Sequence, residues 1–326
     1  MLPPLAAAAF ALAATAAGAA TEVRVMGFGG SSNWPLYVAQ ERALFARSGL
    51  DVRISTARDS TTQLADLAEG RIDIAMTAFD NVVAWDERHD AANALVAFVG
   101  VNNGGRSSLI AAPRVASTAQ LRGGRLGVDA VASGYALVLQ ELLHRAGVEP
   151  GGYVLMSVGG SRQRWEALRD GRVDATLLNA PYDATAENAG FRKLASSSVL
   201  GAYQGSSGAA KRAWAEANAG TIVAFIRAYV AAVDWLHEAA NQEAAIAILV
   251  KHLPAMRQDE AERSYRELVV EPGGFSPHAA FDLEGARTVL ELRRAYGGAA
   301  QASHDITYFY DARYYARAVA AGRAGK

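Results

Sequence analysis

The chain has 326 residues, a formal net charge of −1 and no cysteine. This length is enough for one large core or two ordinary domains, and the near-neutral charge gives no general attraction to nucleic acid or to an anionic membrane. The lack of cysteine excludes disulfides, thiolate metal sites and a catalytic thiol, and the six histidines are scattered without a His-x-x-x-His pair. We therefore predict neither a metal centre nor a cofactor.

Residues 1–20 are rich in alanine and leucine, carry no charged side chain and end in Ala17-Gly18-Ala19-Ala20. This pattern is typical of a signal peptide, and it predicts cleavage after Ala19 or Ala20. Because no Lys or Arg stands near its start, a membrane anchor remains the alternative. No later stretch is expected to be long and apolar enough to span a membrane. We expect an exported protein that is soluble after cleavage.

The first third of the chain alternates short apolar runs with helical patterns. Pro35 lies where the first turn of a helix tolerates proline, and Asp80 is expected to open a helix as its N-cap. The predicted strands cover residues 22–28, 51–55, 72–78 and 94–101, and the predicted helices cover residues 35–48, 62–69 and a segment that begins at Asp80.

Residues 123–195 repeat this style. An apolar run over 125–129 precedes small residues and then a helical pattern over 134–146, with Ser133 as its N-cap and Gly147 as the left-handed residue after its C-cap. A strand that leads through a small-residue turn into a helix exposes N–H groups and the positive end of the helix dipole, which suit an anion. Further strands are predicted over 153–158, 173–178 and 191–195, and helices over 162–170 and 181–189.

Two segments of the chain match each other. Ser60 and the run Gly70-Arg71-Ile72-Asp73 correspond in phase to Ser161 and the run Gly171-Arg172-Val173-Asp174, and each run stands between a predicted helix and a predicted strand. Sequence similarity in the same structural setting predicts two related α/β lobes that face each other.

The pattern changes after Gly201. A long amphipathic helix is marked by Ile222, Phe225, Ile226, Tyr229, Val233 and Leu236, and shorter helices without strands follow. These helices are expected to cover the sheet of the first lobe, so the chain crosses between lobes near residues 106–113 and 196–205, which makes a hinge plausible. The predicted first lobe comprises residues 21–108 and 203–326, and the predicted second lobe comprises 109–202.

In an open α/β sheet, ligands bind beyond the carboxyl ends of the strands. The loops at these ends are rich in small, hydroxyl and amide residues. The candidate ligand-binding residues are Ser32, Asn33, Trp34, Ser60, Thr61, Phe79, Asp80, Asn81, Ser133, Gly134, Tyr135, Arg162, Asn179 and Tyr182.

Each candidate also has a simpler interpretation. A single Ser or Thr there is an ordinary helix cap, and Asp80 serves as an N-cap as readily as a ligand contact. Trp34, Phe79, Tyr135 and Tyr182 either line the site or belong to the core. Arg162 is the exception, because a cation at a helix start opposes the dipole and its presence there favours an anion in the cleft.

Motifs of several enzyme classes are missing from the sequence. The run Gly27-Phe28-Gly29-Gly30 follows a strand but lacks the third glycine of a dinucleotide loop. The sequence has no Walker loop and no Gly-x-Ser-x-Gly elbow. No nucleophile is paired with a base, and we therefore predict a binding protein rather than an enzyme.

Residues 25–315 resemble the periplasmic substrate-binding proteins of ABC importers, of the nitrate, sulfonate and taurine type, a group that includes proteins similar to thiamine-pyrimidine synthases. The resemblance rests on Pro35-Leu36-Tyr37-Val38-Ala39, Leu44-Phe45 and Gly49-Leu50, on Asp80-Asn81-Val82-Val83-Ala84, on Gly127-Val128-Asp129 with Ser133-Gly134-Tyr135, on Val158-Gly159-Gly160-Ser161, and on the two Gly-Arg-x-Asp runs with the apolar residues that follow them. The cysteine motif of the pyrimidine synthases is absent, because the chain has no cysteine.

The resemblance implies an α/β protein of the periplasmic-binding-protein type II fold, with two Rossmann-like lobes joined by two crossover segments and a helical C-terminal part. It implies a monomer in the periplasm that captures a small molecule and delivers it to the permease of an ABC importer. A small organic anion, a sulfonate or carboxylate, is the expected ligand, while Asp80 leaves room for an amine or a nitrogen heterocycle. The alternatives are an enzyme on the same fold, acting on a small metabolite or a pyrimidine-like compound, and a sensor domain, which the export signal disfavours.

Overall fold

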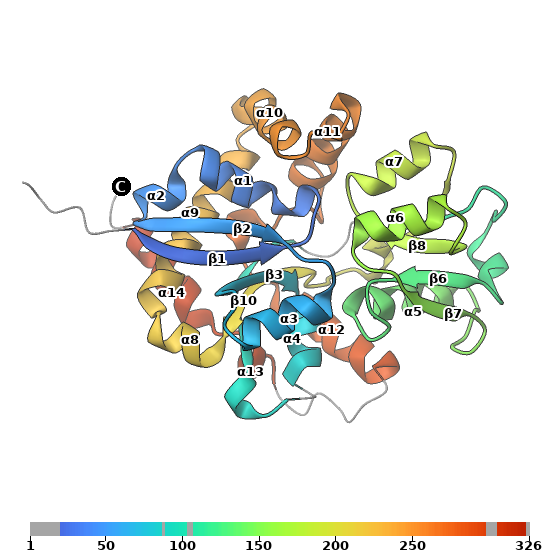
Figure 1. Ribbon diagram of the computed structural model, residues 1–326, viewed down its shortest axis with the longest axis horizontal. Coiled ribbons are helices and arrows are strands. Elements are labelled where there is room, and N and C mark those ends of the chain that lie inside the picture. Colours follow the sequence, from blue (N-terminus) through green and yellow to red (C-terminus); the bar gives the residue numbers. More distant parts are fainter. Residues whose placement is uncertain (1–19, 87–88, 103–106, 298–304, 324–326) are drawn as a thin grey trace, which may run out of the picture.

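The computed structural model describes residues 20–86, 89–102, 107–297 and 305–323. Within them, two five-stranded sheets lie beside each other (Figure 1). The first sheet has the order β2-β1-β3-β10-β4, with bounds β1 Thr21–Gly27, β2 Leu50–Thr56, β3 Ile74–Ala78, β4 Leu95–Gly100 and β10 Ser206–Lys211. The second has the order β7-β6-β8-β5-β9, with bounds β5 Ser108–Ala111, β6 Arg125–Val128, β7 Val154–Ser157, β8 Ala175–Leu178 and β9 Arg192–Ser196. We call each sheet with its helices a lobe.

The two sheets have the same topology and register. In each, four strands run in the same direction and one strand between two of them runs antiparallel, which is β10 in the first sheet and β5 in the second. Val25 lies opposite Ile74 in the first sheet, and Leu126 lies opposite Ala175 in the second. The sequence repeat therefore corresponds to two structurally equivalent lobes, as predicted. The residue boundaries of the lobes stay a prediction.

An equivalent carboxylate joins the strands in both lobes, buried in the first lobe and half-buried in the second. Asp73 accepts a hydrogen bond of 2.7 Å from the backbone N–H of Arg24, whose guanidinium donates to Gly70 O at 2.8 Å. Asp174 accepts 2.7 Å from the N–H of Arg125, whose guanidinium donates to Gly171 O at 2.9 Å. The Gly-Arg-x-Asp run thus places an acceptor beside the equivalent arginine of β1 and of β6.

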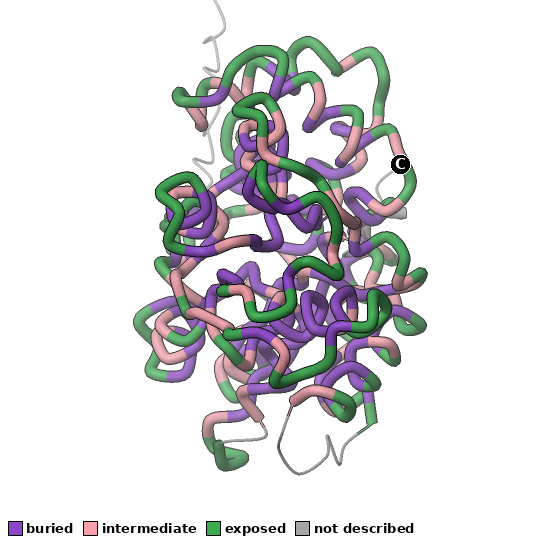
Figure 2. Tube along the Cα trace, turned by 90° about the vertical axis from the view of Figure 1, so that its right-hand side faces the viewer, coloured by how far each residue is buried: buried purple, intermediate pink, exposed green. Residues whose placement is uncertain are grey.

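The helices cover both faces of each sheet. Their bounds are α1 Trp34–Glu41, α2 Leu44–Arg47, α3 Ser60–Ala68, α4 Phe79–Asp86, α5 Gly134–Arg145, α6 Ser161–Arg169, α7 Tyr182–Asn188, α8 Arg212–Ala217, α9 Ala219–His237, α10 Gln242–His252, α11 Gln258–Tyr265, a π-helical turn Arg266–Val270, α12 Leu283–Tyr296, α13 Ile306–Phe309 and α14 Ala312–Arg323. Buried residues fill the interior of both lobes (Figure 2). The predicted N-cap Ser133 accepts a hydrogen bond from Ala136 N, and Gly147 has φ +75°, so both predicted ends of α5 are confirmed.

The expectation that no strand follows Gly201 is wrong. Residues 206–211 form β10 in the middle of the first sheet, although their small side chains have low strand propensity. Gly208 explains the departure, because a Cβ there would lie 2.7 Å from Val99 Cγ1 and 3.2 Å from the Phe98 ring. Close packing beneath these bulky residues, rather than strand propensity, places the segment in the sheet.

The predicted first crossing also shifts, since β5 occupies 108–111 in the second sheet. The expectation that no later stretch is long and apolar enough to span a membrane is also wrong by length and composition, because α9 has a mean hydropathy of 1.4 in its most apolar window. Its predicted apolar face, with Phe225 and Tyr229 fully buried, packs into the core against α1, α2 and α14. We therefore interpret α9 as the core helix of the first lobe.

The predicted helix over 35–48 is interrupted. Its two parts, α1 and α2, are separated at Ala43, which has a left-handed φ of 53°. The interruption turns Phe45 into the core, where it stacks on Phe225 with ring centroids 5.4 Å apart. Packing of one aromatic residue thus outweighs a continuous helix of good propensity.

We expect the paired aspartates to matter more for stability than an exposed ion pair. Asp73→Ala and Asp174→Ala should each lower the free energy of unfolding by about 1–3 kcal/mol, because the strand N–H loses its acceptor. Asp51→Ala, which removes an exposed pair with Arg53, is the control and should cost about 0.5 kcal/mol or less. Urea denaturation measures all three, and equal losses for Asp51 and Asp73 would contradict the prediction.

Candidate functional site

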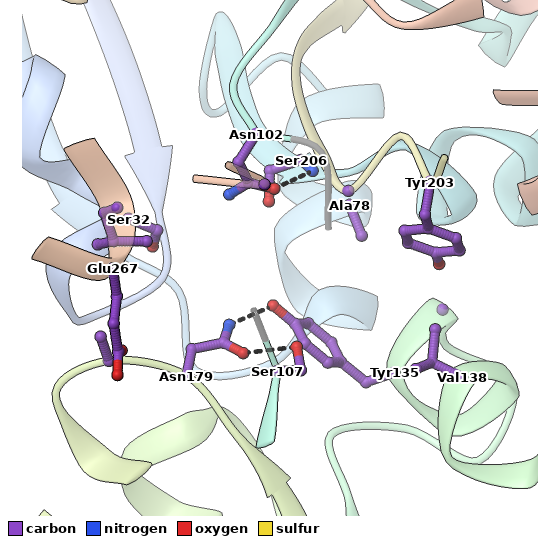
Figure 3. Close-up of a pocket in the computed structure, with 15 residues that line it drawn as sticks. Ser32, Ala78, Asn102, Ser107, Tyr135, Val138, Asn179, Tyr203, Ser206 and Glu267 are labelled. Atoms are coloured by element: carbon purple, nitrogen blue, oxygen red, sulfur yellow. Dashed lines mark hydrogen bonds between the residues drawn. The ribbon is translucent and has the colours of Figure 1, made fainter. Parts of the chain in front are cut away.

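A cleft lies between the lobes, beyond the carboxyl ends of their parallel strands. It has two adjoining parts, which we name by a residue that lines only one of them (Figure 3 shows the first). The Tyr203 chamber has about 680 Å³ of open space, part of it continuous with solvent, and is lined by Ser32, Ala78, Asn102, Ser107, Gly134, Tyr135, Val138, Asn179, Ala180, Tyr203, Gly205, Ser206, Glu267, Leu268 and Gly273. The Arg164 chamber shares Ser32, Ala78, Tyr135, Asn179, Ala180 and Ser206 and adds Phe28, Gly29, Asn33, Met76, Val101, Asp129, Ser161 and Arg164.

Five of the predicted site residues line this cleft: Ser32, Asn33, Gly134, Tyr135 and Asn179. Tyr135 and Asn179 form its best-defined polar contact. Asn179 Nδ2 donates to the Tyr135 hydroxyl at 2.5 Å, and Ser107 Oγ donates to Asn179 Oδ1 at 2.7 Å (Figure 3). This chain of bonds fixes the Tyr135 ring between the two chambers.

Two predicted aromatic residues belong to the core instead. Trp34 is fully buried, donates its indole N–H to Ala245 O at 3.0 Å and packs edge-on against Tyr265. Phe79 is also fully buried and packs against Phe281. Each begins a helix directly after a strand or loop of the first lobe, and the phase of that helix turns its side chain inward rather than into the cleft. Tyr182 is half-buried outside both chambers.

Asp80 holds a structural ion pair. It lies inside the first turn of α4, which begins at Phe79, so the prediction of an N-cap at Asp80 is wrong. Arg293 of α12 donates to Asp80 Oδ1 at 3.0 Å, and both side chains are at most 2% exposed. A carboxylate already neutralised in this way offers little to an amine ligand. Gly134 is required beside it, since a Cβ there would lie 2.8 Å from Asp80 Cβ.

Ser60 and Ser133 lie just outside the cleft wall and bind Asp129, which lines it. Ser60 Oγ, from the first lobe, donates to Asp129 Oδ2 at 2.8 Å, and Ser133 Oγ donates to Asp129 Oδ1. Asp129 immediately follows β6 in the second lobe, and its hydrogen bond with Ser60 of the first lobe links the two lobes at the cleft. Thr61 beside it is exposed, while Asn81 is buried and donates to Thr77 Oγ1 at 3.0 Å.

Arg162 does not reach the cleft. Its side chain is 65% exposed and lies 3.8 Å from Glu166, one turn along α6. Arg164 lies there instead: it is 1% exposed and lines the chamber that bears its name. The expectation that Arg162 and the helix end at Ser133 face one cleft is therefore wrong for the arginine. The two arginines are two residues apart on a helix, so they point to opposite sides.

Arg164 is held by neutral groups. Its guanidinium donates to Leu177 O at 3.0 Å, to Gly159 O at 3.1 Å and to Ser161 Oγ at 3.0 Å, and its Cζ lies 4.8 Å from the centre of the Tyr135 ring. Among the described residues, no carboxylate forms an ion pair with it at 4.0 Å or less. Burial lowers the pKa of the guanidinium, and the charge of nearby Asp129 partly opposes this. The result is a buried cation on the wall of the cleft.

Sequence reasoning missed several lining residues. Asn102, Ser107, Tyr203 and Ser206 come from the segments that cross between lobes, and Asn102 Oδ1 accepts from Ser206 N at 3.1 Å (Figure 3). The rule that ligands bind beyond the carboxyl ends of parallel strands says nothing about these crossing segments. The sequence did contain a signal for Arg164. The repeat aligns it with Gln63, so the second lobe has a charged residue where the first lobe has a neutral one, although neighbouring positions of the repeat match. Glu267, in the π-helical turn, had none.

A carboxylate beneath the cleft has a raised pKa. Asp183, in the first turn of α7, is 1% exposed, and it accepts hydrogen bonds from Ala184 N at 2.8 Å and Ser108 Oγ at 3.2 Å. Burial, followed by the charge of Glu267, raises its pKa to about 6, against the lowering effect of these hydrogen bonds and of Arg263. Within the described ranges, no group of three or more His, Asp or Glu residues is arranged to hold a metal ion.

The fold and the cleft define the periplasmic-binding-protein class of α/β structure. A protein of Bordetella bronchiseptica RB50 matches with a TM-score of 0.80 at 21% identity, over 93% of this chain and 98% of that one. The nitrate-binding protein NrtA from Synechocystis PCC 6803 matches with a TM-score of 0.79 at 15% identity, over 92% and 89%. The alkanesulfonate-binding protein SsuA from Xanthomonas axonopodis pv. citri, bound to MOPS, matches with a TM-score of 0.73 at 17% identity, over 86% and 95%.

The chain belongs to the NMT1-like family, whose model matches residues 18–250. No curated protein sequence matches the chain. Besides binding proteins, the solved structures that match include the enzyme DszB, as a cysteine-to-serine mutant in complex with biphenyl-2-sulfinic acid, with a TM-score of 0.63 at 12% identity. At these identities the structural matches establish the fold.

Asp183 should make stability depend on pH. Because its folded pKa of about 6 is above the unfolded value of 3.8, the folded state keeps the proton longer, and the free energy of unfolding falls as pH rises from about 4 through about 6. The full loss is about 3 kcal/mol. Asp183→Asn keeps the acceptor for Ala184 N but does not ionise, so its stability relative to the parent should increase over this range. Urea denaturation at several pH values measures the difference, and a pH-independent difference would contradict the assignment.

Proposed function

We propose that this protein is an exported solute-binding protein. It captures a small organic anion, of the sulfonate or carboxylate type, between its lobes and delivers it to the permease of an ABC importer. The observation that carries the proposal is the guanidinium of Arg164 on the cleft wall. A buried charge is costly unless a charged partner completes it, and a bound anion would supply that partner.

The surroundings of Arg164 favour an anion over a cation. Asp129, the nearest acidic side chain on the chamber wall, already accepts from Ser60 and Ser133. Glu267, in the other chamber, is paired with Arg263 at 2.8 Å. Asp80, which left room for an amine, is paired with Arg293. Among the described residues of the cleft, Arg164 and Asp129 are thus the charged groups that form no ion pair at 4.0 Å or less. Two hydroxyl donors already satisfy Asp129, so a bound anion at Arg164 is the favoured choice, and the matching binding proteins for nitrate and alkanesulfonate are consistent with it.

The lining of the Tyr203 chamber favours an organic rather than an inorganic anion. Apolar groups of Tyr135, Val138 and Leu268 line it, as is usual in sites that hold small organic molecules. A bare inorganic anion would leave these surfaces without contacts. The cleft therefore favours an anion that carries an apolar body.

Arg164→Gln is a replacement that the fold already tolerates at the equivalent position. In the first lobe, Gln63 follows Ser60 as Arg164 follows Ser161, and its Nε2 donates to Met26 O at 2.9 Å and to Met76 O at 3.2 Å. Leu177 O, which Arg164 binds, is the counterpart of Met76 O. A glutamine at 164 can therefore satisfy the same strand carbonyl while it removes the charge.

We expect Arg164→Gln to lose about 2 kcal/mol of binding free energy, or about thirtyfold in Kd, for the anion that stabilises the parent best in a thermal-shift screen. The screen compares alkane- and arylsulfonates and carboxylates with nitrate and amino-heterocycles. Arg162→Gln is the matched control, and because its side chain is exposed it should bind within about twofold of the parent. Titration calorimetry measures both variants.

Equal affinities for Arg164→Gln and the parent would overturn the anion site. The same titrations test the alternative that the protein is an enzyme, an alternative suggested by the matching structure of DszB. A ligand recovered chemically unchanged after long incubation supports the binding role, whereas steady product formation above a protein-free blank would move the protein to the enzyme class.

Export is a separate part of the proposal. Residues 1–19 lie outside the described residues, and β1 begins at Thr21, so cleavage after Ala19 or Ala20 would leave the first sheet complete. Mass spectrometry of the periplasmic fraction should find an N-terminus at Ala20 or Thr21. Soluble protein that still carries Met1 would contradict export by cleavage.

A further inference from the structure

Tyr203 presents a hydroxyl group to the cleft that the described residues leave without a hydrogen bond. It lies in the crossing segment just before β10, is 6% exposed and lines its chamber on the side away from Glu267 (Figure 3). The hydroxyls of Tyr153 and Tyr229 also lack a partner, but they are sealed inside the protein. The Tyr203 hydroxyl differs because a molecule in the cleft can reach it.

Such a group requires a partner once a ligand fills the cleft. A ligand that displaces water from a hydroxyl and gives no hydrogen bond in return leaves the hydroxyl unsatisfied, at a cost of about 1–3 kcal/mol. Burial and the charge of Asp80 raise the pKa of Tyr203 well above its usual value, so the phenol stays neutral and keeps a proton to donate. It therefore offers a donor to an acceptor oxygen of a ligand.

The charges near Tyr203 disfavour a second anion. Asp80, which affects its ionisation, is neutralised by Arg293, and Glu267 on the far side of the same chamber is paired with Arg263. Neither cation is left to balance a second negative group. The polar end of a ligand in this chamber should accordingly be uncharged.

One side of the surface between Arg164 and Tyr203 is apolar or aromatic. The Tyr135 ring borders both chambers, with Arg164 on its face, and Ala78 and Val138 continue the wall beside Tyr203. The Tyr135 hydroxyl already accepts a hydrogen bond from Asn179, which lines both chambers. A ligand that touches both ends must pass this surface with a hydrocarbon or aromatic body.

We infer that the ligand is an elongated monoanion. Its anionic group binds at Arg164, its apolar body lies along Tyr135 and Val138, and a neutral oxygen at its far end, of a hydroxyl, carbonyl or ether, accepts from the Tyr203 hydroxyl. This inference rests on the proposed function, because it adds the second pole to the same anion site. The inference predicts that such a ligand binds more tightly than nitrate, simple alkanesulfonates or dianions.

The test uses matched probes and a variant that removes one atom. Alkanesulfonates from propane- to octanesulfonate, and the same chains with a terminal hydroxyl, are titrated into the parent, Tyr203→Phe and Arg164→Gln. At the chain length that fits, the terminal hydroxyl should tighten binding to the parent about two- to tenfold. Tyr203→Phe should abolish this gain and leave the affinity of the plain sulfonate unchanged.

Tyr153→Phe is the matched control for loss of a buried tyrosine hydroxyl, and it should keep the gain. Arg164→Gln should weaken both members of each probe pair by the same factor. The inference is overturned if no hydroxylated probe gains at any length, if Tyr203→Phe weakens both members equally, or if an alkanedisulfonate binds better than the hydroxylated probe. If no sulfonate and no carboxylate of the screen binds in a way that depends on Arg164, the proposed function fails first and the inference fails with it.

Discussion

Each lobe depends on a polar side chain that turns back from a helix onto the carbonyl groups of a strand. In the first lobe the side chain is Gln63, which donates to Met26 O and Met76 O, and in the second it is Arg164, which donates to Leu177 O. Buried carbonyls need a donor, so a residue with a long polar side chain is required at this position in both lobes. The second lobe meets the same structural need with a charged group. The positive charge of Arg164, and the guanidinium N–H groups that make no hydrogen bond within the protein, can then interact with a ligand in the cleft.

A second constraint fixes the lobes relative to each other at this cleft. The buried pair of Asp80 and Arg293 joins α4 to α12, and Arg293 also donates to Ala132 O of the second lobe at 3.4 Å. Breaking one partner of a buried pair leaves an uncompensated charge and typically costs about 3–5 kcal/mol. The pair lies behind Tyr203 and Gly134, so the geometry of the Tyr203 chamber depends on it. Ser60 and Asp129 add a hydrogen bond between the lobes on the other side.

The chemistry of the cleft is therefore divided between its two ends. One end has a buried cation against an aromatic face, and the other has a neutral donor beside charges that are already paired. Such an arrangement selects for both ends of a molecule at once, because a group that leaves either donor unsatisfied loses a hydrogen bond in a buried setting. The matching fold of binding proteins for nitrate and sulfonate is compatible with many ligands, since fold by itself does not set specificity.

The sequence by itself determined what depends on neighbouring residues. Ser133 and Gly147 end α5 as predicted because caps act within one turn of a helix. The Gly-Arg-x-Asp runs identified two equivalent lobes, because the same local pattern makes the same strand contact twice. Five predicted residues, among them Tyr135 and Asn179, line the cleft because they follow strands that end there.

Only the tertiary structure decided the rest. Arg162 and Arg164 look alike in a sequence, but two residues along a helix turn a side chain to the opposite side, and the packing of α6 determines which one is buried. Tyr203 and β10 reach the site because residues distant in the sequence pack there: Gly208 fits beneath Phe98 and Val99, and its strand brings the crossing segment to the cleft. Contacts between residues about a hundred positions apart leave no periodic trace in the sequence, so only the folded chain reveals them.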